Sequence, residues 1–142
     1  MKKTTFLLPF FSLIFTLNLI GQSPVGTWKT IDDETGKAKS QVEIYESGGK
    51  LFGRVTQLLI SSPDKKCDKC PGEKKGQPIV GMNVIENMEA KKGMWKGGKI
   101  LDPEKGKVYA CEFWLADGNP DELKLRGYIA FFYRTQTWYR VK

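Results

Sequence analysis

Two closely spaced cysteines are the pattern in this sequence that comes nearest to a reactive motif. Cys67 and Cys70 are separated by two residues, the spacing of many redox pairs, and neighbouring lysines place positive charge beside both thiols. Redox pairs of this kind are expected at a helix N-terminus beside a βαβ unit, whereas this pair lies in a stretch rich in Gly, Pro and Lys. We therefore predict a disulfide that staples a loop in an oxidising compartment, with a redox role as the alternative. Cys111 falls on the apolar face of a predicted strand and is interpreted as a buried hydrophobic side chain.

The histidine and carboxylate content argues against the common catalytic sites. The sequence contains no histidine, which removes the commonest general base and metal ligand and every triad that uses one. Two acidic clusters, Asp32-Asp33-Glu34 and Asp121-Glu122, fall in predicted turns, and nothing indicates that they converge on a cleft. Two loop thiols and one strand thiol do not supply the four good ligands of a structural zinc site. We predict no catalytic site, no metal site and no cofactor.

Short strands separated by turn residues account for most of the sequence. Turn residues recur at short intervals with β-branched and aromatic residues between them, a spacing typical of a hairpin meander. Gly48-Gly49 supplies the positive φ angles of a tight hairpin turn. Residues 61–78 are predicted to form a loop, and residues 83–92 fit either a strand, which we favour, or a short capped helix. The predicted strands cover residues 25–31, 38–47, 50–60, 83–92, the neighbourhood of Ile100, and residues 107–115, 122–130 and 131–141.

About eight strands joined by short loops predict a single all-β domain, an antiparallel up-and-down barrel rather than a Greek-key sandwich. A barrel of this size encloses a space that side chains fill or that one small ligand occupies. Aromatic residues then form both the core and the wall of any cavity. Either Arg126 or Arg134 would engage a polar group of the ligand. The residues predicted to bind the ligand are Tyr109, Phe113, Leu125, Arg126, Tyr128, Phe132 and Arg134.

The N-terminal residues have the pattern of an export signal. Lys2 and Lys3 precede an apolar stretch that contains no charge up to Gln22 and is too short and too interrupted for a membrane span. We predict a signal peptide over residues 1–21, cleaved after Gly21, and a barrel domain over residues 22–142; the alternative is an uncleaved anchor. Loss of the two lysines lowers the formal net charge from +7 to +5. The remaining lysines are spread over predicted loops, which favours a solvated surface over a polyanion-binding one.

Several segments also resemble known families. The sequence Val25-Gly26-Thr27-Trp28-Lys29 resembles the opening strand of lipocalin and fatty-acid-binding barrels, in which Gly-x-Trp closes the barrel floor and an Arg of the last strand covers the Trp. This resemblance implies that Trp28, Trp138 and Arg140 close the barrel. A longer succession of segments runs along nearly the whole predicted domain, at residues 26–28, 32–37, 50–55, 67–72, 78–81, 97–103, 106–109, 125–128 and 137–140. In its order and spacing this succession resembles the DUF2147 family, which implies a lipocalin-like barrel in a small exported bacterial protein and carries over no catalytic residue.

These observations favour a binding protein over an enzyme. The first hypothesis is an exported carrier or sensor, periplasmic or extracellular, that holds a small apolar or amphipathic ligand in the barrel. The alternative is a cell-envelope interaction module with a filled barrel, whose loops and basic surface contact a protein or an anionic polymer. An enzyme of unknown type ranks third. No nucleic-acid partner and no stable membrane insertion after signal cleavage are expected.

Overall fold

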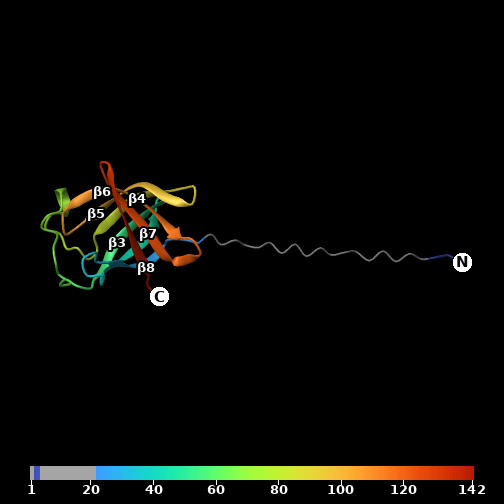
Figure 1. Ribbon diagram of the computed structural model, residues 1–142, viewed down its shortest axis with the longest axis horizontal. Helices are drawn as coiled ribbons and strands as arrows, with labels where there is room; N and C mark the ends of the chain where they lie inside the picture. The colour runs from blue at the N-terminus through green and yellow to red at the C-terminus, as the bar shows by residue number, and fades with distance from the viewer. Residues whose placement is uncertain (1, 4–21) are drawn as a thin grey trace.

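The strands follow one another around a closed barrel in the order of the sequence (Figure 1). The computed structural model describes residues 2, 3 and 22–142, so the predicted signal peptide lies almost entirely outside the described residues. All neighbouring strands are antiparallel, and the predicted up-and-down barrel of eight strands is confirmed. The elements are β1 (Gly26–Ile31), β2 (Ala38–Ser47), β3 (Lys50–Leu58), the 3-10 helix η1 (Gly72–Lys74), β4 (Asn83–Lys91), β5 (Met94–Asp102), β6 (Lys107–Ala116), β7 (Asn119–Ile129) and β8 (Phe132–Arg140).

The predicted strands agree with the observed ones apart from their ends. Residues 83–91 form a strand, so the favoured alternative for this segment is confirmed. Residues 61–78 form the predicted loop, which contains η1 and an isolated bridge between Lys66 and Pro78. β5 extends well beyond the neighbourhood of Ile100, because the strand continues through a bulge at two glycines. Within the described residues, no helix has the length and apolar character needed to cross a membrane.

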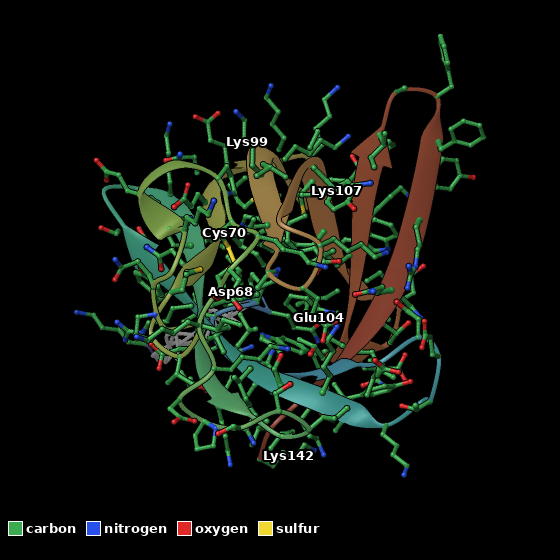
Figure 2. All side chains as sticks on the ribbon, turned by 90° about the vertical axis from the view of Figure 1, so that its left-hand side faces the viewer. Asp68, Cys70, Lys99, Glu104, Lys107 and Lys142 are labelled. Carbon is green, nitrogen blue, oxygen red and sulfur yellow. A yellow bond between two sulfur atoms is a disulfide. The ribbon has the colours of Figure 1, made fainter. Side chains whose placement is uncertain are left out.

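The up-and-down order places the connections alternately at two ends of the barrel. One end, called the open end here, carries residues 32–37, 59–82, 103–106 and 130–131. The other, called the closed end, carries the turns at 48–49, 92–93 and 117–118 together with residues 23–25 and the C-terminus. Figure 2 looks onto the open end, where the long 59–82 loop and its disulfide lie.

The core follows the alternation of each strand and fills the closed end. Inward residues of β2, such as Val42 and Ile44, are buried. Wholly buried side chains from other strands join them, among them Trp28, Met88, Phe113 and Leu123. Burial of these large apolar groups is the main favourable contribution to the stability of the barrel. The core side chains therefore do not fill the part of the barrel interior that lies near the open end.

The first and last strands are joined at the closed end. β1 and β8 pair at only two positions, Trp28 with Arg140 and Lys29 with Tyr139. The Arg140 guanidinium carbon lies 4.3 Å from the centroid of the Trp28 ring, so the predicted contact is confirmed. The Trp28 indole N–H donates to the Pro24 carbonyl at 2.8 Å. Arg140 donates to the main-chain carbonyls of Val25, Ser23 and Pro120 at 3.1, 2.9 and 3.0 Å.

Gly26 explains why the closing motif begins with glycine. Its φ angle of +141° lies in a region that L side chains rarely adopt, and a Cβ there would lie 2.8 Å from Nη1 of Arg140. A larger residue would therefore push the guanidinium away from Trp28. Trp138, the third predicted closure residue, is buried, and its indole N–H donates to the Gln136 side chain at 3.2 Å. Trp138 belongs to the wall of the cavity described below rather than to the Trp28–Arg140 contact.

Candidate binding cavity

A cavity of about 390 Å³ occupies the barrel near the open end. Its volume lies within the range of about 300–1,000 Å³ that is typical of small-molecule sites. The deep wall is apolar and comes from inward positions of β2, β3, β7 and β8: Val42, Val55, Leu125 and Trp138, all buried. Both the volume and the apolar wall suit the burial of a hydrocarbon or aromatic group.

Gly127 creates part of this space. It lies on β7 between the inward residues Leu125 and Ile129, where any side chain would project into the barrel. A Cβ at this position would meet Cβ of Tyr109 at 3.6 Å, an ordinary van der Waals contact, and its φ angle is not in the left-handed region. The absence of a side chain at Gly127 therefore reflects no backbone requirement, and it leaves room inside the cavity.

One polar pair lies among the apolar wall residues. Thr30 and Ser40 are opposite each other on β1 and β2, both are buried, and their hydroxyl oxygens are 2.7 Å apart. Either hydroxyl can donate to the other, and the pair retains acceptor capacity for a ligand hydroxyl or amide. The ligand-binding residues predicted from the sequence do not include this pair. Strand alternation contains the signal, because Thr30 follows Trp28 by two positions and Ser40 precedes Val42 by two.

The rim of the cavity carries more basic than acidic groups. Lys39, Lys65, Lys105 and Arg134 line it, together with the acidic residues Asp102 and Glu104. The Lys39 ammonium lies 2.9 Å from the Glu104 carboxylate, and Arg134 pairs with Asp33. Lys65 and Lys105 form no ion pair among the residues that the structure describes. These two ammonium groups remain available to an anion at the mouth.

Most of the residues predicted to bind a ligand lie at the cavity. Those that line it are Tyr109, Leu125, Phe132 and Arg134. Phe113 is wholly buried in the core and does not line the cavity. Arg126 and Tyr128 are placed elsewhere, on the outer face of β7, because the alternation that points Leu125 and Gly127 inward points the intervening residues outward. Their predicted position in the cavity is therefore corrected.

Arg126 and Tyr128 instead form a polar cluster on the outside of the barrel. The Arg126 guanidinium carbon lies 5.0 Å from the centroid of the Trp114 ring and 4.6 Å from that of Tyr133. Arg126 Nε also donates to the Thr135 hydroxyl at 2.9 Å. The Tyr128 hydroxyl donates to the Glu112 carboxylate, and this hydrogen bond raises the pKa of Tyr128. These contacts hold both side chains on the outer surface of the sheet.

The cysteines do not supply a reactive thiolate. Cys67 and Cys70 are joined in the predicted disulfide. Burial raises the pKa of the Cys111 thiol to about 12, so this thiol is protonated at neutral pH. In the part of the chain that the structure describes, no three His, Cys, Asp or Glu side chains are grouped as ligands for a metal ion.

The disulfide loop packs against the turn between β5 and β6. Sγ of Cys67 lies 3.2 Å from the carbonyl oxygen of Pro103. Gly106, with a φ angle of +65°, lies so close to the main chain of Lys69 that a Cβ would come within 1.8 Å of the Lys69 carbonyl oxygen. Since Pro103 and Lys105 line the mouth, the loop supports one side of the cavity entrance. Figure 2 labels Asp68 and Cys70 in this loop and Glu104 in the turn, all on the side of the barrel that faces the viewer.

Comparisons with known proteins agree with this architecture. The structure is similar to that of protein HP1028 from Helicobacter pylori, which is described as belonging to the lipocalin family; the TM-score is 0.74, the sequences are 21% identical, and the match covers 86% of this chain and 85% of that chain. This likeness shows a lipocalin-like barrel fold. No curated protein matches the sequence. A family model described as "Uncharacterized protein conserved in bacteria (DUF2147)" matches residues 26–140, from the first strand to the last. The chain therefore belongs to the DUF2147 family.

Proposed function

We propose that this protein is a non-enzymatic binding protein that holds one small amphipathic molecule, with its apolar part in the barrel and an anionic group at the rim. The observation that carries this proposal is the cavity of about 390 Å³, apolar at depth and basic at its mouth. The likeness to a lipocalin-like barrel supports a binding role by analogy of fold alone.

Three features of the cavity select different parts of the ligand. The apolar part gains about 25 cal/mol for each Å² that it removes from water against Val42, Leu125 and Trp138. At the rim, Lys65 and Lys105 offer charge-assisted hydrogen bonds to a carboxylate, sulfonate or phosphate. The Thr30–Ser40 pair suits a hydroxyl or amide group in the middle of the ligand. A molecule with an apolar body, one internal polar group and an anionic end satisfies all three features.

The chemistry of the lining favours binding over catalysis. The sequence provides no histidine as a general base. Glu104 and Asp33, the carboxylates that meet basic groups at the mouth, are paired with Lys39 and Arg134 and lie at exposed positions. The open cavity also favours a ligand-holding barrel over the filled interaction module considered from the sequence.

We further propose that the protein is exported and acts outside the cytoplasm. The charged and apolar pattern of residues 1–21 supports this, and a disulfide between Cys67 and Cys70 is compatible with an oxidising compartment. N-terminal analysis of exported protein is expected to begin at Gln22. An intact Met1 on the exported protein would show that the signal is not cleaved.

Filling the cavity from Gly127 tests the binding proposal. Gly127→Leu is expected to weaken binding of the fluorescent anion anilinonaphthalene sulfonate by about tenfold or more, because the added side chain occupies the ligand space. Gly127→Ala, which adds a single methyl group, is the graded control and should have a smaller effect. Fluorescence titration measures the affinities, and thermal unfolding shows that the variants remain folded. Equal affinity in Gly127→Leu and the parent would place the probe outside the cavity.

The uncharged analogue N-phenyl-1-naphthylamine separates the rim from the apolar wall. Gly127→Leu should weaken both probes, because both have the same aromatic body. The double variant Lys65→Gln/Lys105→Gln should weaken only the sulfonate, by about two- to fivefold, the size expected for exposed charge interactions. An equal loss for both probes would contradict the assignment of these lysines to an anionic group.

A further inference from the structure

The turn between β7 and β8 exposes a cluster of large apolar side chains. Phe131 is 99% exposed and Phe132 78%, while Tyr133 and Ile129 are 63% and 49% exposed. We call these four residues the aromatic tip. Figure 2 shows the hairpin extending beyond the rest of the barrel with its aromatic side chains directed outward. Large contiguous apolar groups on a surface indicate a contact with a partner.

The turn itself gives no reason for a phenylalanine at this position. Two-residue hairpin turns favour Asn, Asp and Gly because of their positive φ angles. Here the turn is Ala130-Phe131, and Ala130 has a φ angle of 50° although it carries a Cβ. The pairing of β7 with β8 continues up to Ile129 and Phe132, so the tip is held by a regular ladder. The structure therefore maintains an exposed Phe131 on an ordered support.

The surroundings of the tip indicate an anionic partner. Lys99 and Lys107, on β5 and β6, lie on the same side of the barrel as the hairpin (Figure 2). Neither lysine takes part in an ion pair among the described residues. Register places both lysines at the level of the hairpin, with Lys107 on the adjacent strand β6 and Lys99 one strand further away: Ala110 pairs with Tyr128 and with Lys99, so the start of β6 lies level with the turn. An aromatic projection flanked by ammonium groups matches the anionic surface and apolar interior of a membrane interface.

The size of the tip favours a lipid surface over a protein partner. A stable protein interface buries about 800 Å² on each side, usually with about 20–30 residues. The tip offers four side chains at the end of one hairpin, too few for such an interface but sufficient to enter the headgroup region. The tip also adjoins the cavity, since Ile129, Phe132 and Tyr133 line its mouth as well.

We propose that the aromatic tip docks the protein reversibly on a lipid surface that carries anionic headgroups, with the mouth of the cavity close to that surface. The barrel does not span the bilayer in this arrangement; Phe131 enters the interface while Lys99 and Lys107 contact the headgroups. The exposed tip and the two lysines support this surface contact, which does not require that the cavity hold a ligand. It would, however, allow an amphipathic ligand to pass between the lipid and the barrel.

Vesicle flotation tests the proposal with the exported form, residues 22–142, whose strands close the barrel without residues 1–21. The parent should bind vesicles made of equal parts phosphatidylcholine and phosphatidylglycerol more strongly than vesicles of phosphatidylcholine alone. Phe131→Ser should lower the partition by about tenfold, because one large apolar side chain no longer leaves water. Tyr139→Ser is the matched control, since Tyr139 is an exposed aromatic residue at the other end of β8, and it should stay close to the parent.

A second variant gives a positional readout. Phe131→Trp should add a tryptophan emission that shifts to the blue on anionic vesicles and is quenched by lipids brominated in their acyl chains, relative to the parent. Lys99→Gln/Lys107→Gln should reduce binding to the anionic vesicles and remove the difference between the two lipid compositions. Equal binding by Phe131→Ser and the parent, or no binding by the parent, would overturn the proposal. Self-association of the parent that Phe131→Ser abolishes without vesicles would also overturn it and assign the tip to a second copy.

The variants Phe131→Ser and Gly127→Leu separate lipid docking from ligand binding in the cavity. Phe131 does not line the cavity, so Phe131→Ser should retain the affinity for N-phenyl-1-naphthylamine. Gly127→Leu should retain vesicle binding while it loses the probe. Loss of vesicle binding in Gly127→Leu would show that the tip does not act independently, and this outcome would contradict the proposal.

Discussion

Trp28→Ala is expected to lower the free energy of unfolding by about 3–5 kcal/mol, the range for truncation of a large aromatic side chain in a core. Trp28 is wholly buried, and it lies where β1 meets β8 through only two paired positions. Its loss leaves a cavity at the closed end and removes the ring on which Arg140 stacks. Few other contacts join the two strands, so the effect should be large. Denaturant unfolding of residues 22–142 measures it.

A double-mutant cycle shows whether the effect depends on Arg140. Arg140→Ala alone should cost less than Trp28→Ala, although it removes three hydrogen bonds to main-chain carbonyls. The double variant should lose less stability than the sum of the single variants, because both remove the same stacked contact. Strictly additive losses, or a Trp28→Ala protein as stable as the parent, would contradict the description of this contact as the closure of the barrel.

The second large effect is expected from Gly106→Ala, which should lower the free energy of unfolding by more than about 2 kcal/mol. Two costs act together at this position. The φ angle of +65° is unfavourable for a residue with a Cβ, and that Cβ would lie 1.8 Å from the main-chain oxygen of Lys69. The disulfide loop must therefore move away from the turn between β5 and β6, which loosens one side of the cavity entrance.

Gly118→Ala is the matched control for this substitution. Gly118 has a φ angle of +68° in the turn between β6 and β7, and a Cβ there meets no atom within 4 Å. The control should therefore show only the backbone cost, about 1 kcal/mol. The difference between the two variants measures the contact with the disulfide loop. Equal losses of stability in denaturant unfolding would show that this loop is not held against the turn.

Much of the fold could be predicted because each strand carries its own signal. In β2 and β7, apolar residues alternate with polar ones, and the turns 48–49 and 117–118 contain Gly or Asp, so the inward faces and these strand limits follow from local sequence. β5 was harder to predict, since Gly97 and Gly98 interrupt its alternation with a bulge. The Trp28–Arg140 contact was implied by a family resemblance and depends on pairing between the two ends of the chain.

The residues of the cavity are harder to predict from the sequence than the strands are. Arg126 and Tyr128 were chosen for their chemistry, although the alternation with Leu125 already points them outward. The Thr30–Ser40 pair and the space at Gly127 depend on the register of several strands and on what each neighbour leaves unfilled. The rim lysines come from separate loops, and no local pattern predicts that Lys65 and Lys105 meet at one mouth. Which side chains meet in the cavity depends on the register of all the strands, and a local stretch of sequence does not show that register.

Native mass spectrometry of the protein, purified gently from its own cells, tests the central claim that the cavity holds a small amphipathic molecule. The parent should carry an added mass that is released on denaturation, whereas Gly127→Leu, prepared in the same way, should show the mass of the polypeptide alone. Identical spectra for the two proteins, both free of any added mass or both with the same added mass, would contradict the claim that this barrel is a binding site.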